Sequence, residues 1–171
     1  MKASLSRSGF TLIELLIVIM VLGILAMIIV PQITISTEDA KESTLQTNLL
    51  ALRNAVELYY NQHANTYPGA KDIAGADPAD AAAAQTAFLQ QLTRYTEEDG
   101  TVSATKTAAA KFGPYIRGGA LPTNSFNNLN TIVCDIAEDD ITVKASGSAA
   151  AWKFYVITGI LMADDGAHDA L

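Results

Sequence analysis

The sequence predicts an α+β fold, in which a long kinked N-terminal α-helix packs on a small head with an antiparallel β-sheet. Three observations lead to this prediction. An unbroken apolar run covers residues 10–30, and a helical repeat of apolar residues continues to about residue 62. Short β-type runs separated by turn residues then occupy residues 131–162.

The apolar run has the length that a bilayer core requires of a helix, about 20 residues. Basic residues precede it (Lys2, Arg7) and acidic residues follow it (Glu38, Asp39, Glu42). By the positive-inside rule this charge distribution predicts a cytoplasmic N-terminus and a C-terminal part outside the membrane. A cleavable secretory signal is the alternative, but its apolar core is shorter and ends at a small-residue cleavage site. Neither feature is evident here, which favours a single-pass anchor.

Beyond the apolar run, residues 31–62 continue the helix in amphipathic form. Apolar residues recur at spacings of four, three, four and three, at Leu45, Leu49, Leu52, Val56 and Tyr59. This face is expected to pack on the head. Pro31 lies between the two halves and is expected to kink the helix or melt it locally, because proline removes a hydrogen bond and clashes with the preceding turn.

The head is predicted to contain one short helix and a meander of strands. Asp77 and Pro78 are expected to cap and begin the helix, which ends at residues 97–100. Residues 101–111 are expected to form an exposed loop. The predicted strands are residues 131–134, 141–145, 152–157 and 160–162, joined as hairpins, followed by a frayed tail at 163–171.

Composition excludes several functions. The formal net charge of −7 argues against a nucleic-acid partner, because phosphate contacts need clustered Lys and Arg. The only cysteine, Cys134, is expected to be a small buried hydrophobe. His63 and His168 are the only histidines, and no hydrolase, metalloprotease, nucleotide-binding or dinucleotide-binding motif occurs. We therefore expect no enzymatic activity and no required cofactor.

Glu14 is the unusual residue of the apolar run. A carboxylate at membrane depth costs about 2.5–3.5 kcal/mol on insertion scales, so such residues usually have a partner or a function. Glu14 lies near the start of the run, however, and the sequence also allows it to lie at the level of the lipid headgroups.

The string Gly-Phe-Thr-Leu-Ile-Glu at residues 9–14, with its basic leader and apolar continuation, resembles the processing signal of type IV pilin-like proteins. The resemblance implies a pilin-like fold, cleavage by a prepilin peptidase between Gly9 and Phe10, and methylation of the new Phe10 amine. It also implies that Glu14 pairs with the Phe10 amine of a neighbouring subunit. The segments would then be a leader (1–9), a transmembrane and filament-core helix (10–30), its amphipathic continuation (31–62) and a periplasmic α+β head (63–171).

The head resembles the major pseudopilins of type II secretion systems, through residues 52–59, Tyr67-Pro68, residues 112–116, Leu121-Pro122 and a late Trp152, Tyr155 and Gly159. This implies a structural subunit of a periplasmic pseudopilus at the bacterial inner membrane. The implied partners are further copies of the chain, minor pseudopilins, the prepilin peptidase, the secretion platform and the lipid bilayer. Many such proteins bind calcium, for which the candidates are Asp135, Asp139 and Asp140, or else Asp164 and Asp165.

Two other functions remain open from the sequence. One is a surface type IV pilin used in adhesion, motility or DNA uptake. The other is a membrane-tethered binding module or enzyme that uses the apolar segment only as an anchor. The absence of a catalytic constellation and the amphipathic continuation of the anchor helix argue against the second.

Overall fold

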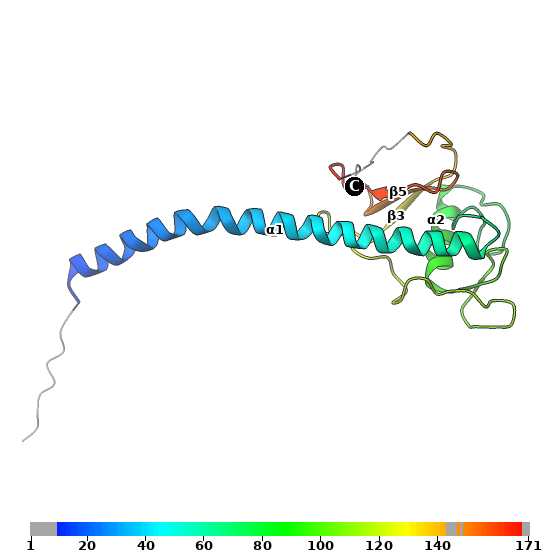
Figure 1. Ribbon diagram of the computed structural model, residues 1–171, viewed down its shortest axis with the longest axis horizontal. Coiled ribbons are helices and arrows are strands. Elements are labelled where there is room, and N and C mark those ends of the chain that lie inside the picture. Colours follow the sequence, from blue (N-terminus) through cyan, green and yellow to red (C-terminus); the bar gives the residue numbers. More distant parts are fainter. Residues whose placement is uncertain (1–9, 143–146, 148, 169–171) are drawn as a thin grey trace, which may run out of the picture. The chain divides into compact units, whose positions relative to one another are not determined.

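A computed structural model describes residues 10–142, 147 and 149–168, and at residues 28–36 it describes the backbone alone. The chain divides into two compact units, Met1–Ala40 and Lys41–Leu171. Helix α1 (Leu12–Gln62) belongs to both (Figure 1). The predicted α+β class and the predicted helix from about residue 10 to about residue 62 are therefore confirmed.

In the first unit, α1 exposes apolar side chains on all sides. Leu12 is 85% exposed, Val21 is 48% exposed and Met27 is 79% exposed, so no side of this segment is covered by the chain itself. Pro31 lies within the continuous helix, so the local melting that we considered is not observed. The expected kink at Pro31 stays a prediction.

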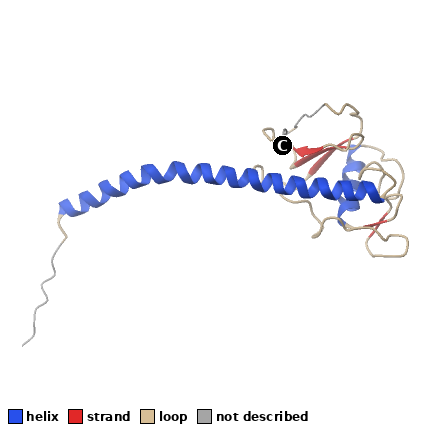
Figure 2. Ribbon diagram, viewed as in Figure 1, coloured by secondary structure: helices blue, strands red, loops and turns tan. Residues whose placement is uncertain are grey.

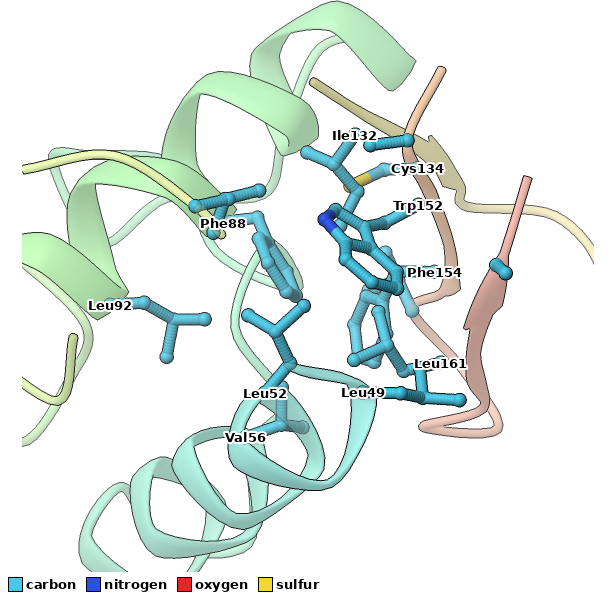
Figure 3. Packing of buried hydrophobic residues seen from close by; sticks show 14 of the residues in the cluster. Leu49, Leu52, Val56, Phe88, Leu92, Ile132, Cys134, Trp152, Phe154 and Leu161 are labelled. Carbon is cyan, nitrogen blue, oxygen red and sulfur yellow. The ribbon is translucent and has the colours of Figure 1, made fainter. Parts of the chain in front are cut away.

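In the second unit, one face of α1 is buried in the head, as the apolar spacing predicts. Its five predicted side chains are at most 2% exposed: Leu45, Leu49, Leu52, Val56 and Tyr59. Figure 3 shows members of this face converging with Phe88 from the second helix and with Trp152 and Phe154 from the sheet. Burying such side chains stabilises the fold by about 1.5–3 kcal/mol each.

The second helix, α2 (Ala81–Thr93), begins later than the sequence predicts. Asp80, not Asp77, is its N-cap, with an extended backbone and a carboxylate that accepts the Ala83 N–H at 2.8 Å. Asp77 instead forms an ion pair with Lys71, with 2.7 Å between Oδ1 and Nζ. The helix also ends earlier than predicted, because the chain then enters a strand.

That strand, β1 (Tyr95–Thr96), pairs antiparallel with β2 (Val102–Ser103). The prediction of a plain loop over residues 101–111 is therefore wrong at Val102 and Ser103. Ala110, at the end of the segment, is fully buried, which also departs from the exposed loop that we expected.

The main sheet has the order β3 (Ile132–Asp135), β4 (Trp152–Tyr155), β5 (Leu161–Ala163). Figure 2 shows these strands as a small part of a head built mostly of loops. β4 and β5 pair antiparallel, as predicted, but β3 and β4 pair parallel. The fully antiparallel meander is therefore wrong. Residues 136–151 provide the crossover of a dozen or more residues that parallel pairing requires.

The strand predicted at residues 141–145 is not found where the structure describes it, because residues 141–142 form a turn. Residues 143–145 lie outside the described residues. The frayed tail is also wrong for residues 163–168. Ala163 belongs to β5, Asp164 is buried, and the His168 ring stacks on Phe126 with 3.8 Å between centroids.

Candidate functional site

The first candidate site is the start of α1, where Thr11 and Glu14 form a reciprocal cap. The Glu14 carboxylate accepts the Thr11 backbone N–H at 2.8 Å and the Thr11 hydroxyl at 2.7 Å. The Glu14 N–H in turn donates to Thr11 Oγ1 at 3.4 Å. This is the Thr-x-x-Glu capping box, which satisfies backbone donors that the first helical turn leaves unpaired.

The capping box gives Glu14 a local role that sequence reasoning missed, although the Thr-x-x-Glu spacing could have revealed it. The first turn of a helix carries the positive end of the helix dipole, so the negative Glu14 carboxylate is also favoured electrostatically at this position. Phe10 immediately precedes this cap and is 81% exposed. Gly9, on the other side of the predicted cleavage point, lies outside the described residues.

The second feature of the site is the exposed apolar surface that follows Glu14. Large apolar side chains between Ile13 and Leu25 are 48–65% exposed. A contiguous apolar surface of this extent marks a site of contact with protein or membrane. In the part of the chain that the structure describes, no helix is both long and apolar enough to cross a membrane.

The predicted calcium ligands do not form a cluster. Asp135 Oδ1 accepts the backbone N–H groups of Ala137 and Glu138, both at 3.1 Å. Asp140 Oδ1 accepts the N–H and hydroxyl of Thr142, and these hydrogen bonds hold the pKa of its carboxyl below the usual range. Asp139 is exposed.

Among the described residues, no three or more His, Cys, Asp or Glu side chains are placed to hold a metal ion. The carboxylates of Asp135 and Asp140 serve as local turn caps, so these residues do not fit a preformed calcium site. Calcium binding stays an untested prediction.

The alternative calcium candidates, Asp164 and Asp165, are held by hydrogen bonds within the head. Asp164 accepts the N–H groups of Gly147 and Ala150. Asp165 Oδ2 accepts from Asn124 at 3.0 Å, and its Oδ1 lies 3.0 Å from His168 Nδ1. Asp164 thus contacts the segment between β3 and β4, and Asp165 contacts the loop that precedes β3, so both acids have a structural role.

The head offers no arrangement for catalysis among the described residues. His63 is buried, and its ring nitrogens lie 2.8 Å from the Tyr59 carbonyl oxygen and 2.9 Å from the Thr96 hydroxyl. The ring also stacks on Tyr59, with 3.7 Å between centroids. Cys134 is buried as predicted, and burial raises the pKa of its thiol to about 12, which disfavours the nucleophilic thiolate at neutral pH.

Comparison with known families identifies the start of the chain. Residues 5–30 match the prokaryotic N-terminal methylation motif. This span contains Gly9, Phe10 and Glu14 together with most of the exposed apolar segment. The similarity that the sequence suggested is therefore confirmed for this part of the chain.

Individual relatives carry the similarity further. Over 62 residues the chain is 40% identical to type II secretion system core protein G of Aeromonas hydrophila. These residues make up 36% of this chain and 43% of that relative. The chain is 39% identical over 59 residues to core protein G of Vibrio cholerae, which is 34% of this chain and 40% of the relative. It is also 43% identical over 54 residues to the type IV major pilin protein PilA of Myxococcus xanthus, which is 32% of this chain and 24% of that protein.

The chain thus spans less than half the length of these curated relatives. No solved structure matches it.

Proposed function

We propose that the chain is a structural pseudopilin subunit, which polymerises through its N-terminal helix into a periplasmic pseudopilus that drives type II protein secretion. The observation that carries the proposal is the methylation motif at residues 5–30, placed on a helix whose apolar side chains are exposed all around. The similarity to core protein G of type II secretion systems supports it. No enzymatic step belongs to this role.

The proposed life of the subunit begins in the inner membrane. A prepilin peptidase cuts between Gly9 and Phe10 and methylates the Phe10 amine. Before cleavage the chain crosses the membrane once, with its N-terminus in the cytoplasm and its head in the periplasm. The basic residues before the apolar run and the acidic residues after it support this orientation.

Cleavage changes the chemistry at the start of α1. It replaces an amide N–H at Phe10 with a cationic amine, one residue before the Thr11–Glu14 cap. In the uncut chain the Glu14 carboxylate is satisfied by Thr11. In a filament, the Phe10 amine of a neighbouring subunit would give Glu14 an opposite charge in an apolar surrounding, where Coulomb attraction is stronger than in water.

This pair would select one axial register between subunits. An unpaired carboxylate surrounded by apolar helices is strongly penalised, so slipped arrangements that leave Glu14 without a cation are disfavoured. Minor pseudopilins, the inner-membrane secretion platform and a separate cytoplasmic ATPase would supply initiation and energy.

A substitution at Glu14 tests the proposal. Glu14→Ala and Glu14→Leu should leave membrane insertion unchanged and reduce filament yield strongly, measured by sedimentation of sheared filaments from cells that carry the secretion platform. The matched control is Glu42→Ala, because Glu42 is an exposed acid of the same helix whose carboxylate contacts Gln46 at 3.3 Å. Filament yields at the wild-type level from both Glu14 variants would refute the proposal.

A surface type IV pilin is the second candidate, and the similarity to the major pilin PilA of Myxococcus xanthus favours it over a tethered module. Electron microscopy of intact cells at native expression distinguishes the two filaments. Long surface fibres indicate a pilus, whereas short filaments confined to the envelope indicate a pseudopilus. A tethered module predicts neither.

A further inference from the structure

One turn of the head presents an apolar side chain to solvent beside two acids. Outside α1, the large exposed apolar residues of the described head are Ile73, Leu129, Ile141 and Ile157. Ile141 is the most exposed of them, at 70%, and it alone directly follows two carboxylates, Asp139 and Asp140. We call residues 139–142 the acidic turn.

The acidic turn is held by its own hydrogen bonds. Asp140 Oδ1 accepts the Thr142 N–H at 2.8 Å and the Thr142 hydroxyl at 2.7 Å, and the Asp140 N–H donates to Glu138 Oε1 at 3.1 Å. These bonds leave the Asp139 carboxylate without a hydrogen bond or ion pair to any described residue. Ile141 is therefore presented on an ordered turn with an exposed acid close by.

A groove that is mainly apolar and carries one positive charge lies between α1 and the loop that follows β2, and it could accept an apolar side chain next to an acid. Its volume is about 340 Å³, within the range of binding pockets. It is lined mainly by apolar groups of Ala51, Leu52, Tyr115, Ile116, Ala120, Leu121 and Pro122, together with Asn48 and Arg117. We call it the Arg117 groove.

Arg117 supplies the only charge among the lining residues. Its side chain is exposed and makes no ion pair or hydrogen bond with the described part of the chain. The larger groove of the head, about 450 Å³, is lined by Tyr67, Ile136 and Ile157 but also by Asp77. In the larger groove the charged lining residue is an acid, Asp77, which is already paired with Lys71, whereas the Arg117 groove offers an acidic turn an opposite charge.

We propose that, in the filament of the proposed function, the acidic turn of one copy places Ile141 in the Arg117 groove of the next copy. The proposal rests on the proposed function, because a filament supplies the second copy. Figure 1 draws the turn after β3, in gold, above the second half of α1, and the yellow-green segment before β3 below it. The acidic turn and the loop that lines the groove therefore come from different segments of the head, after and before β3.

Such a contact is heterologous, because it joins two different surfaces, and it repeats from copy to copy. The apolar contact of Ile141 with Ala51, Ile116 and Ala120, which line the groove and are exposed or half-buried, would provide the attraction. The pairing of Asp139 with Arg117 would select the orientation, because a buried apolar contact alone is not directional.

Cysteine cross-linking of the full chain tests this contact. Ile141→Cys and Ala120→Cys are introduced into the same chain, which is expressed with the assembly machinery and oxidised in membranes. The expected result is a ladder of disulfide-linked multimers on non-reducing gels. Ile141→Cys alone should stay monomeric, because the contact is not symmetric. Ile157→Cys combined with Ala120→Cys is the matched control and should give no ladder.

Reversing the charge at residue 117 provides a second test of the contact. In the double-cysteine chain, Arg117→Glu should lower the yield of multimers by about tenfold or more, and adding Asp139→Lys should restore it. Both positions are exposed, so neither change disturbs the core. A ladder that is absent, or that is unchanged by Arg117→Glu, would overturn the proposal.

Filament yield from the wild-type chain is measured in parallel. Wild-type filaments without a cross-linked ladder would refute the contact and leave the pseudopilin function standing. An absence of wild-type filaments, together with an unprocessed N-terminus, would refute both.

Discussion

The two halves of helix α1 carry similar apolar side chains but in opposite surroundings. In the first half, Leu22 is 58% exposed, and in the second half Leu52 is 1% exposed. The second half is amphipathic and its apolar face is covered by α2 and the sheet, whereas the first half is apolar on every side. The head is therefore stabilised by contacts within its own chain, whereas the exposed apolar side chains of the first half are left for other molecules to cover.

Truncating one leucine in each half is expected to give the largest contrast. Leu52→Ala should lower the free energy of unfolding of the head by about 2–5 kcal/mol, because it leaves a cavity in the core. Leu22→Ala should change it by no more than about 0.5 kcal/mol. The measurement is denaturant unfolding of the full chain in detergent, followed by Trp152 fluorescence. Equal losses from the two variants would contradict the division of the helix.

A buried amide provides the next test, within the head. Gln91 is fully buried, and its side chain accepts the Gly69 N–H at 2.8 Å and donates to the carbonyl oxygens of Lys71 and Gly100 at 3.1 and 3.0 Å. Gln91→Leu leaves these groups unpaired and should cost about 1–3 kcal/mol or more. The same change at Gln90, which makes none of these contacts, is the control. Thermal unfolding measures both, and a Gln91→Leu chain as stable as the control would contradict a stabilising role for this amide.

Removing one helix cap in each unit is the next test. Asp80→Ala removes the N-cap of α2 and should lower the unfolding free energy of the head by about 1 kcal/mol. Thr11→Ala removes the equivalent group at the start of α1 and should leave the head unchanged, because Thr11 belongs to the other unit. Urea midpoints of the two variants measure this difference. A shift from Thr11→Ala as large as that from Asp80→Ala would contradict it.

The smallest expected effect is a pH dependence of head stability. Burial lowers the pKa of His63, partly offset by the Tyr59 carbonyl and the charges of Glu98 and Asp99. Below pH of about 6.5 the unfolded chain binds a proton that the folded chain resists, so stability should fall as the pH is lowered from 7 towards 5.5.

The comparison is made in a His168→Gln background, in which His63 is the only histidine. Melting temperatures across this range should fall in that background and fall less in the His63→Gln, His168→Gln chain. Parallel pH profiles of the two chains would show that His63 does not contribute.

The sequence predicts the helical parts of this fold better than its sheet. Periodicity is a local property, so the spacing of Leu45, Leu49 and Leu52 was enough to place the buried face of α1. Strand direction depends on partners far apart in the chain, which is why the parallel pairing of β3 with β4 was missed. The start of α2 was missed because Asp77 and Asp80 are both acceptable caps, and the ion pair of Asp77 with Lys71 leaves the role to Asp80.

The sequence was enough to predict the motif of the candidate site, but not the hydrogen bonds that its side chains form. The string at residues 9–14 indicated processing, and the matched methylation motif confirms that similarity. The hydrogen bonds between Thr11 and Glu14 become clear only when the helix start is known. The buried position of His63 was missed because it depends on Thr96 and Tyr115, which approach from distant segments.

Mass spectrometry of the N-terminus of protein recovered from its native host would show whether α1 is processed for assembly. If the first half of α1 is an assembly element, the recovered chain should begin at Phe10 and carry a methyl group on its amine. A chain that still begins at Met1, with residues 1–9 attached, would contradict this account, because Glu14 would then have no cationic amine on a neighbouring subunit.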